Sequence, residues 1–278
     1  LPFAVIKQAS VPSQGLGEFE AYGLIGDLAC TLQPIFAIPR LDIIALPYVP
    51  GSIDLEACAH RDSAEAIDVL LAVGSKLFGL QLKAPPGNLQ PAKGFLTLPV
   101  PNVTEVGDLN GALERLISIV QERRLLSDED VSLVSAQPLR LAHFDLKLDN
   151  ILVASGVGIV VDWELAGPAP LGWDLASCVG AMLFAWTRDQ RDRTDRAISV
   201  PTIDYVLDAA RELLLRYQHF TESNNLPGLD CAALRAMIIM YLLDRLASEA
   251  CAKLDLTPVD HVVLEFVSIL SRSKDLRD

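Results

Sequence analysis

Basic residues and long apolar runs are what this sequence of 278 residues has least of. Lys and Arg number 23 against 36 Asp and Glu, so the formal net charge is −13. Phosphate backbones and anionic lipid surfaces attract a positive face, so neither a nucleic acid nor a membrane is expected as a partner. No apolar stretch approaches the roughly 20 residues that a membrane-spanning helix needs. We therefore expect a cytoplasmic protein.

Cysteine is also scarce, and its spacing is irregular. None of the five cysteines forms a C-x-x-C motif, and all stand among apolar neighbours: Cys30, Cys58, Cys178, Cys231 and Cys251. This pattern indicates reduced thiols in a hydrophobic core rather than a disulfide framework or a zinc site. Disorder is excluded because 51% of the residues are hydrophobic, which is enough for a full core.

The apolar periodicity divides the chain unevenly. Short strand-like runs at 3–6, 35–38 and 43–48, with one helical segment at 18–32, occupy the start of the chain. From residue 64 onward the pattern is mostly helical, with apolar faces at 67–78, 113–120, 203–220, 231–251 and 258–270. A stretch rich in proline and glycine at 84–106 predicts a long loop. The fold class is therefore expected to be α+β.

One segment in the middle of the chain breaks the helical pattern. Two β-branched, apolar runs at 150–154 and 158–162 are joined by residues 155–157, which predicts an antiparallel hairpin. Pairing about that turn places Asn150 beside Asp162, with Asp145 on the loop just before. Converging oxygen ligands suit Mg²⁺, which keeps waters and binds substrate phosphates. Each residue taken alone is more commonly a turn residue or a solvated strand end, so the prediction depends on the combination.

The same segment carries two motifs, His143-Phe-Asp145-Leu-Lys147-Leu-Asp-Asn150 and Val-Val-Asp162-Trp-Glu. They resemble the catalytic and metal-binding loops of protein-kinase-like enzymes. The Asp-Trp-Glu ending is more similar to the aminoglycoside phosphotransferase and choline kinase branch than to the Asp-Phe-Gly of protein kinases. The resemblance implies a bilobal protein-kinase-like fold with a small, β-rich N-lobe at 1–50 and a large, mainly helical C-lobe at 51–278.

The resemblance extends toward the N-terminus. Ala4-Val-Ile-Lys7 is similar to the strand whose lysine grips the nucleotide phosphates, and Glu20 to the ion-pair partner of that lysine, with Glu18 as the alternative. The run that ends in Pro47, Tyr48 and Val49 is similar to the hinge whose backbone contacts adenine: these are nucleotide-binding candidates.

Two further residues resemble structural supports of the catalytic loop. Asp174 follows Gly172-Trp173 and is similar to the family's aspartate at a helix start, which supports the catalytic loop from below. A plain helix N-cap is the alternative interpretation of Asp174. His143 is expected to support the loop as a hydrogen-bonded core histidine.

The activity that the resemblance implies is phosphoryl transfer, which requires positioning and charge neutralisation. Asp145 would orient or deprotonate the acceptor hydroxyl, Asn150 and Asp162 would hold Mg²⁺, and Lys7 would hold the phosphates of ATP or another NTP. Lys147 departs from the histidine of the antibiotic kinases and is similar to the lysine that faces the transferred phosphate in Ser/Thr protein kinases. A solvated loop lysine is its alternative interpretation.

Kinase-like folds place a hairpin with a phosphate-covering loop before the lysine strand. In this sequence the lysine strand begins almost at Leu1, and the first residue is not Met. We therefore expect the N-lobe to be truncated in the sequence as given, with the hairpin belonging to a preceding piece of a longer protein.

The acceptor stays open between hypotheses of different classes. A small-molecule hydroxyl, including one on a cationic antibiotic-like acceptor, is favoured by the acidic charge. A Ser/Thr peptide kinase of natural-product maturation is the second hypothesis, motivated by Lys147 and by an apolar composition that could supply a protein partner interface or a homodimer. A nucleotide-binding pseudokinase subunit is the third, and it is disfavoured because Lys7, Asp145, Asn150 and Asp162 are all present.

Overall fold

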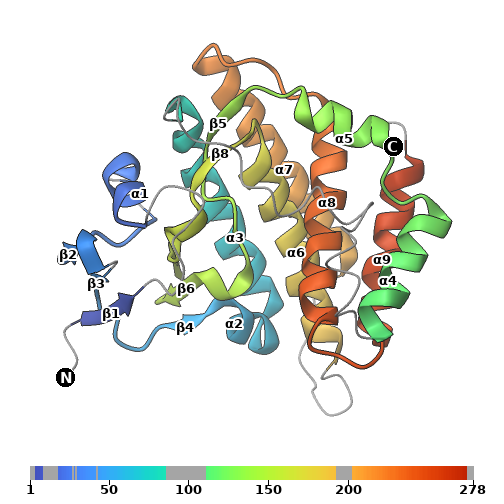
Figure 1. Ribbon diagram of the computed structural model, residues 1–278, viewed down its shortest axis with the longest axis horizontal. Coiled ribbons are helices and arrows are strands. Elements are labelled where there is room, and N and C mark those ends of the chain that lie inside the picture. The colour runs from blue at the N-terminus through green and yellow to red at the C-terminus, as the bar shows by residue number, and fades with distance from the viewer. Residues whose placement is uncertain are drawn as a thin grey trace. The chain divides into compact units, whose positions relative to one another are not determined.

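The computed structural model (Figure 1) describes residues 4–8, 18–26, 28, 30–41, 43–85, 111–191 and 202–273. The chain divides into two compact units, Leu1–Ala92 with Leu139–Gly228, and Lys93–Pro138 with Leu229–Asp278. This division differs from the expected lobe boundary at residue 50, which stays a prediction. The first unit contains every site residue predicted from the sequence. Most of the predicted loop at 84–106 lies outside the described residues.

The first sheet is antiparallel and has the order β1-β3-β2. Its strands are β1 (Ala4–Gln8), β2 (Phe36–Ile38) and β3 (Ile43–Pro47), with the short helix η1 (Pro39–Leu41) after β2. The three strands predicted in this region are thus confirmed, with ends shifted by one or two residues. The pairing places Lys7 opposite Ile44 on the central strand.

Helix α1 (Glu18–Ile25) is shorter than the helix predicted at 18–32. It ends because Gly26 adopts a left-handed φ of 61°, a conformation that glycine takes without steric cost at a helix C-terminus. The N–H of Gly26 donates to the carbonyl oxygen of Tyr22 at 3.1 Å and closes the last turn.

The predicted hairpin is present, but its turn is one residue shorter than expected. Strands β4 (Ile53–Asp54), β6 (Ile151–Ala154) and β7 (Val157–Val160) form a sheet in the order β4-β6-β7. Only Ser155 and Gly156 lie in the turn, both with positive φ, as a type I′ turn requires. The register pairs Ile151 with Val160. Asn150 consequently bonds to Val161 rather than lying directly opposite Asp162, because its carbonyl oxygen accepts from the Val161 N–H at 2.9 Å.

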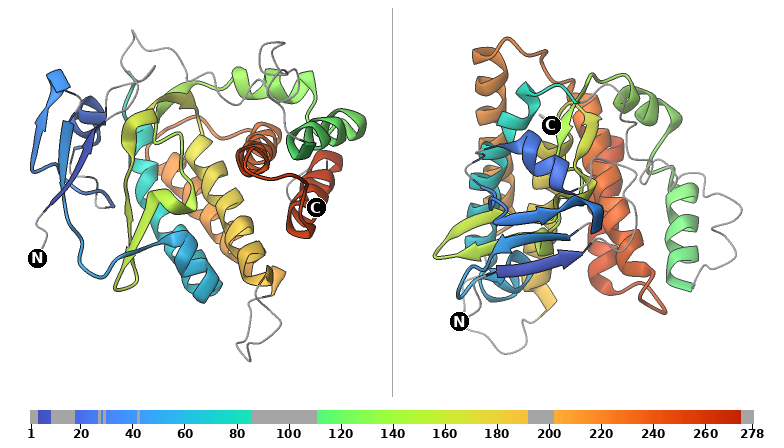
Figure 2. Two further views of the ribbon diagram at one scale, coloured as in Figure 1. Left: turned by 60° about the horizontal axis from the view of Figure 1, so that its bottom comes forward. Right: turned by 60° about the vertical axis from the view of Figure 1, so that its left-hand side comes forward.

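The remaining described elements of the first unit are α-helices, short 3-10 helices and two further strands. They are α2 (Leu55–Arg61), α3 (Ser63–Leu77), η2 (Phe78–Leu82), β5 (Leu139–Ala142), η4 (Leu148–Asn150), η5 (Trp163–Leu165), β8 (Gly167–Pro170), α6 (Trp173–Arg191) and α7 (Ile203–Ser223). Strands β5 and β8 pair antiparallel, and α3 packs against α6, α7 and β7. The blue sheet and the yellow-green hairpin can be followed in Figure 2.

One glycine allows the hairpin to approach α3 closely. A Cβ atom at Gly158 would lie only 2.5 Å from Cγ2 of Val73 and 2.7 Å from Cγ1 of Val69. Both distances are shorter than carbon atoms tolerate, so no larger residue fits at this position without movement of the hairpin or the helix. The close packing of β7 on α3 thereby fixes the strand that leads into Asp162.

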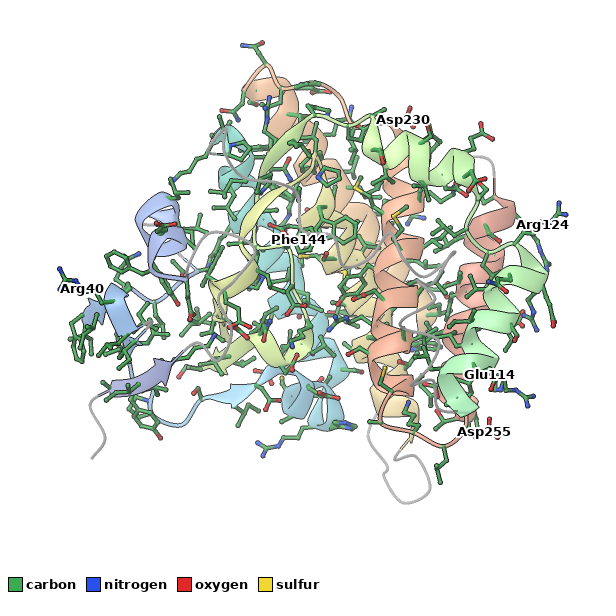
Figure 3. All side chains as sticks on the ribbon, in the orientation of Figure 1. Arg40, Glu114, Arg124, Phe144, Asp230 and Asp255 are labelled. Atoms are coloured by element: carbon green, nitrogen blue, oxygen red, sulfur yellow. The ribbon has the colours of Figure 1, made fainter. Side chains whose placement is uncertain are left out.

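The second unit is helical in its described part. It contains α4 (Gly111–Arg123), α5 (Asp128–Ser135), α8 (Cys231–Ala250) and α9 (Pro258–Arg272), and α8 packs against the other three. Helix α4 is amphipathic: Leu116 and Val120 are buried, whereas the charged side chain of Glu114 points outward (Figure 3). No described helix combines the length and the apolar character needed to cross a bilayer.

The expectation that all five cysteines lie in a core is wrong for two of them. Cys30, Cys58 and Cys178 are buried free thiols, but Cys231 and Cys251 are exposed. The exposed pair stands at the first residue and just past the last residue of α8.

Helix α9 begins with a capping box that should make its stability depend on pH. Asp260 accepts from the Thr257 N–H at 2.6 Å and lies 3.0 Å from Nζ of Lys253. Burial alone would raise the pKa of Asp260, but these hydrogen bonds outweigh it and hold the pKa below its usual value. A carboxylate with a lowered folded pKa stabilises the fold above its unfolded pKa of about 3.9, and this stabilisation is lost as the pH falls through the folded value.

Asp260→Asn is therefore expected to lower the free energy of unfolding by about 1–2 kcal/mol at pH 7. The difference in unfolding free energy between the parent and the variant should narrow as the pH falls below about 4, because the carboxylate takes up a proton first in the unfolded chain and, at still lower pH, in the folded protein. Urea denaturation at a series of pH values measures it, with the exposed Glu114→Gln as the control. A destabilisation that is equally large at pH 7 and pH 3 would contradict the assignment.

Candidate active site

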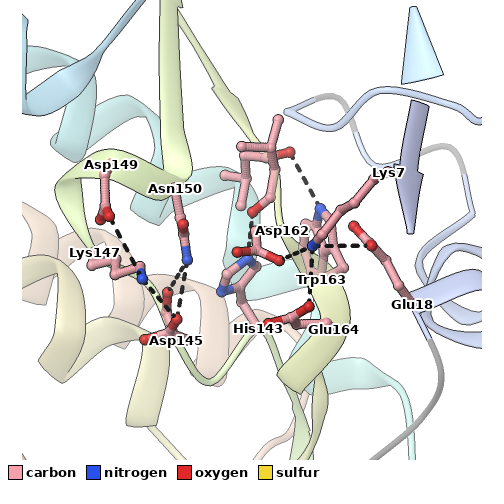
Figure 4. A network of polar contacts seen from close by, with 12 residues as sticks. Lys7, Glu18, His143, Asp145, Lys147, Asp149, Asn150, Asp162, Trp163 and Glu164 are labelled. Atoms are coloured by element: carbon pink, nitrogen blue, oxygen red, sulfur yellow. Dashed lines mark hydrogen bonds and ion pairs between the residues drawn. The ribbon is translucent and has the colours of Figure 1, made fainter. Parts of the chain in front are cut away.

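Two loops of the first unit bring the predicted catalytic and metal-binding side chains together (Figure 4). The loop between β5 and η4 carries Asp145, and Asn150 ends η4. Nδ2 of Asn150 donates to the backbone oxygen of Asp145 at 2.9 Å and to its carboxylate Oδ2 at 3.2 Å. Because the amide nitrogen of Asn150 is held by Asp145, Oδ1 is the atom that can bind a cation.

Lys7 lies at the centre of a cluster of carboxylates. Its Nζ contacts Oδ1 of Asp162 and lies 3.1 Å from Oε2 of Glu18 and 3.2 Å from Oε2 of Glu164. Burial by itself would lower the pKa of Lys7, but the hydrogen bond to Asp162 and the charge of Glu18 outweigh it and raise the pKa above its usual value. The ammonium group consequently stays charged, as phosphate binding requires.

The residue of α1 that pairs with Lys7 is Glu18, so the prediction of Glu20 is corrected. Glu20 is exposed, whereas only 8% of Glu18 is exposed. Helix α1 begins at residue 18 and turns one face inward, and this face consists of Glu18, Ala21, Tyr22 and Ile25. The spacing i, i+3, i+4, i+7 in the sequence is the signal that could have identified Glu18. Burial raises the pKa of Glu18, and the charge of Lys7 opposes that shift.

Aromatic packing connects α1 with the catalytic loop. The ring of Tyr22 lies 6.5 Å from that of the fully buried Trp163, which meets the ring of His143 edge-on at 4.5 Å. Trp163 follows directly after Asp162, which adopts a left-handed φ of 63°. This conformation is uncommon outside glycine and is tolerated by Asp, and it turns the chain from β7 into η5. The position of Glu18 is thus tied to that of Asp162.

His143 and Asp174 hold the catalytic loop from inside. Nε2 of the fully buried His143 lies 3.0 Å from the carbonyl oxygen of Val161, so Nε2 carries the proton. Burial lowers the pKa of His143, which therefore stays neutral. Asp174 accepts the backbone N–H groups of His143 at 2.9 Å and Phe144 at 3.2 Å. It lies inside the first turn of α6 and bonds to the loop, which fits the supporting role better than a plain N-cap.

The side chain of Lys147 contacts carboxylates of the catalytic loop and is only partly exposed to solvent. Its Nζ lies 3.5 Å from Oδ2 of Asp145 and 3.5 Å from Oδ2 of Asp149. Its side chain is 28% exposed, whereas that of Asp149 is 53% exposed. The ammonium group therefore lies beside the candidate base, where a transferred phosphate would also be placed.

Phe144 holds a strained backbone conformation directly before Asp145. Its φ is 75°, a value that costs a residue other than glycine about 1–3 kcal/mol. The indole N–H of Trp173 donates to the Phe144 carbonyl oxygen at 3.0 Å, and the two rings stack at 5.5 Å with 19° between their planes. Sequence reasoning missed Trp173. The signal for it was the bulky Phe144 directly before Asp145, which needs an aromatic neighbour to pack against.

Comparison with known proteins identifies the family to which the chain belongs. A family model described as "Phosphotransferase enzyme family" matches residues 26–213, more than half of the chain. The chain belongs to this family. A search of curated protein sequences finds no match to this phosphotransferase.

Solved structures show the same fold at low sequence identity. Glucosamine kinase in complex with glucosamine, ADP and inorganic phosphate has a TM-score of 0.68 and a sequence identity of 18%. The match covers 97% of the present chain and 75% of the glucosamine kinase chain. Choline kinase LicA from Streptococcus pneumoniae has a TM-score of 0.52 and a sequence identity of 16%, and the match covers 96% of the present chain and 85% of LicA. Choline kinase from Cryptosporidium parvum Iowa II has a TM-score of 0.57 and a sequence identity of 13%, and the match covers 92% of the present chain and 77% of that choline kinase chain. The predicted α+β class and protein-kinase-like fold are confirmed.

The predicted hinge of this phosphotransferase follows the central strand of the first sheet. Pro47 ends β3, and 39% of Tyr48 is exposed. The carbonyl oxygen of Val49 accepts from the N–H of Ser52 at 3.3 Å and from its Oγ at 3.0 Å, so this carbonyl group is engaged in a turn. The role of all three residues in adenine binding stays a prediction.

The donor set of the phosphotransferase fits Mg²⁺ bound together with a nucleotide. Within the described part of the chain, no three histidine, cysteine or acidic side chains are grouped so as to hold a metal ion by themselves. Asn150 and Asp162, the predicted ligands, would instead supply one amide and one carboxylate oxygen, both hard ligands. Mg²⁺ is commonly held by one or two protein groups and completes its coordination with phosphate oxygens and waters.

Proposed function

We propose that the protein transfers the γ-phosphate of ATP, or of another NTP, to a hydroxyl group of a small molecule. The observation that carries the proposal is the convergence of Lys7, Asp162 and Asn150 with Asp145 in one compact unit. Family membership supports phosphoryl transfer as the reaction type, and the site supplies a group for each step that this chemistry needs.

The nucleotide would bind where Lys7 now contacts carboxylates. Glu18 is buried and holds Lys7 from one side, so it remains the fixed partner when Lys7 turns from Asp162 to a phosphate oxygen. Asp162 and Asn150 would hold Mg²⁺, which supplies neutralisation of the phosphate charge. The exchange keeps every charged group paired, because Lys7 gains phosphate as Asp162 gains the cation.

Asp145 would act on the acceptor hydroxyl. Its carboxylate is fixed by Nδ2 of Asn150 and lies 3.5 Å from Nζ of Lys147. A carboxylate held in this way can orient the hydroxyl and take its proton as the bond to phosphorus forms. Lys147 would then neutralise the negative charge of the phosphate in transit.

The charge around the site favours a cationic acceptor. Two ammonium groups, on Lys7 and Lys147, face five carboxylates, on Glu18, Asp145, Asp149, Asp162 and Glu164. An excess of negative charge raises the local concentration of cations such as Mg²⁺ or a protonated amine. The compared structures are kinases of glucosamine and choline, and an amino sugar, a choline-like amino alcohol or an aminoglycoside is accordingly our proposed acceptor class.

A Ser/Thr peptide is the second candidate acceptor, because Lys147 lies beside Asp145 as the resemblance to protein kinases implies. A protein partner or homodimer stays a prediction from the apolar composition.

The test combines nucleotide binding with an acceptor screen. Calorimetry should detect ATP binding in the presence of Mg²⁺ and much weaker binding without it. ATP-dependent mass shifts are then measured across amino sugars, choline-like amines, aminoglycosides and a Ser/Thr peptide library. Phosphorylation of a small amine-bearing alcohol supports the proposal, and phosphorylation of peptides alone supports the second candidate. Absence of nucleotide binding would overturn both and leave a non-enzymatic family member.

Glu18 and Glu20 form a matched pair on the same helix for testing the nucleotide site. Glu18→Gln should raise the Kd for Mg·ATP about tenfold, equivalent to about 1.4 kcal/mol, because Lys7 loses its buried partner. Glu20→Gln should change the Kd less than about twofold, since Glu20 is exposed. Calorimetric titration of each variant measures this, and equal effects of the two changes would contradict the assignment of Glu18.

A further inference from the structure

Two side chains in the first turn of α6, those of Trp173 and Asp174, form hydrogen bonds with both backbone polar groups of Phe144. The N–H of Phe144 donates to Oδ1 of Asp174 at 3.2 Å. Its carbonyl oxygen accepts from the indole N–H of Trp173 at 3.0 Å, and the two rings stack at 5.5 Å. Two successive side chains of one helix thus hold a single residue of the catalytic loop.

These hydrogen bonds restrain Phe144 in a backbone conformation that is unfavourable for a residue other than glycine. Phe144 has a φ of 75°, in the left-handed region that favours glycine. A side chain other than glycine stays there only where its surroundings over-determine the backbone. Two hydrogen bonds restrain it: the Phe144 N–H donates to Asp174, and the Trp173 indole N–H donates to the Phe144 carbonyl oxygen.

The restraint on Phe144 also limits the orientation of the next residue in the chain, Asp145. The carbonyl group held by Trp173 belongs to the peptide unit that joins Phe144 to Asp145. The carbonyl oxygen of Asp145 accepts from Nδ2 of Asn150 at 2.9 Å. The peptide units on both sides of the Asp145 Cα atom are therefore held by side chains, and they set the direction in which its carboxylate leaves the backbone.

We propose that Trp173 is a positioning residue for Asp145, acting through the Phe144 carbonyl group. This inference rests on the proposed function for its catalytic consequence, whereas its structural part concerns the loop alone. The competing view is that Trp173, which is 3% exposed, only fills the core of the first unit. The two views make different predictions for a variant that keeps an aromatic ring at position 173 but lacks the indole N–H. Only the positioning role predicts that this variant alters the loop around Asp145.

The kinetic test is a double-mutant cycle with Mg·ATP and the acceptor found in the screen, or water as the acceptor in ATP hydrolysis. Trp173→Phe should lower kcat about tenfold and change KM for ATP less than about twofold, because the nucleotide-binding side chains are not altered. In a Phe144→Gly background the same change should lower kcat only about twofold, since glycine adopts positive φ without help. An equal loss in both backgrounds, or no loss, would overturn the inference.

A second measurement does not depend on phosphoryl transfer. Amide hydrogen exchange of the peptide spanning residues 143–147 should become about tenfold faster in Trp173→Phe, because the Phe144–Asp145 peptide unit loses its restraint. Trp186→Phe, on the same helix, is the matched control and should leave this exchange unchanged. If the parent protein transfers no phosphate, the proposed function fails while the exchange result still decides the role of Trp173. Unchanged exchange in a folded Trp173→Phe variant would overturn the inference.

Discussion

Replacement of Asp145 by Asn is expected to lower kcat by about 10³-fold while the Kd for Mg·ATP changes less than about threefold. The amide keeps the size of the side chain and can still accept the hydrogen bond from Nδ2 of Asn150, so the loop geometry is preserved. It cannot take a proton from the acceptor hydroxyl, and the loss therefore falls on the chemical step. Initial rates with the identified acceptor and calorimetric titration of the nucleotide separate the two effects.

Asp149 provides the control for this change. It lies at the same 3.5 Å from Nζ of Lys147 as Asp145 does, but its side chain is 53% exposed. Asp149→Asn should therefore change kcat less than about threefold, because an exposed ion pair contributes little. An Asp145→Asn variant as active as the parent, or no less active than Asp149→Asn, would refute the proposed base.

Replacement of Asp162 by Asn is expected to raise the Kd for Mg·ATP about 100-fold. Asp162 is the charged member of the proposed Mg²⁺ ligand pair, and an amide oxygen binds the cation more weakly than a carboxylate does. The same change removes a partner of Lys7, but Glu18 and Glu164 remain within 3.2 Å of the ammonium group. The fold around Lys7 should consequently survive.

The dependence on Mg²⁺ distinguishes a metal ligand from a general loss of binding. Asp162→Asn should affect ADP binding little when Mg²⁺ is removed with a chelator, and strongly when Mg²⁺ is present. Calorimetry under both conditions measures this, and Glu20→Gln serves as an exposed carboxylate control. A loss of the same size with and without Mg²⁺ would mean that Asp162 does not bind the cation.

The parts of the site that could be predicted from the sequence are those close together along the chain. Asp145 and Asn150 are five residues apart, and a loop followed by one short turn brings them together almost regardless of the rest of the fold. Lys7 was predicted through the resemblance of Ala4-Val-Ile-Lys7 to a nucleotide-binding strand, and the structure places it in β1. The class of fold followed from the same motifs together with the change from strand-like to helical periodicity.

The errors have local physical causes. The motif indicates Glu20 rather than Glu18 because it does not specify which face of α1 packs inward. That face is set by the contact of Tyr22 with Trp163. The apolar pattern predicts a hairpin turn one residue longer than the observed one, and a one-residue change shifts every partner of Asn150 along the opposite strand. Apolar neighbours predict a core position for Cys231, although this residue begins a helix at the surface.

The sequence by itself determined which residue types the candidate site contains, because spacing within a loop or a hairpin limits where neighbouring side chains can lie. Only the tertiary structure decided how distant segments meet. Lys7 and Asp162 are 155 residues apart, and Trp173 reaches Phe144 across 29 residues. Contacts of that range depend on which faces the helices and strands bury, and burial is settled by the packing of the whole unit rather than by any one segment.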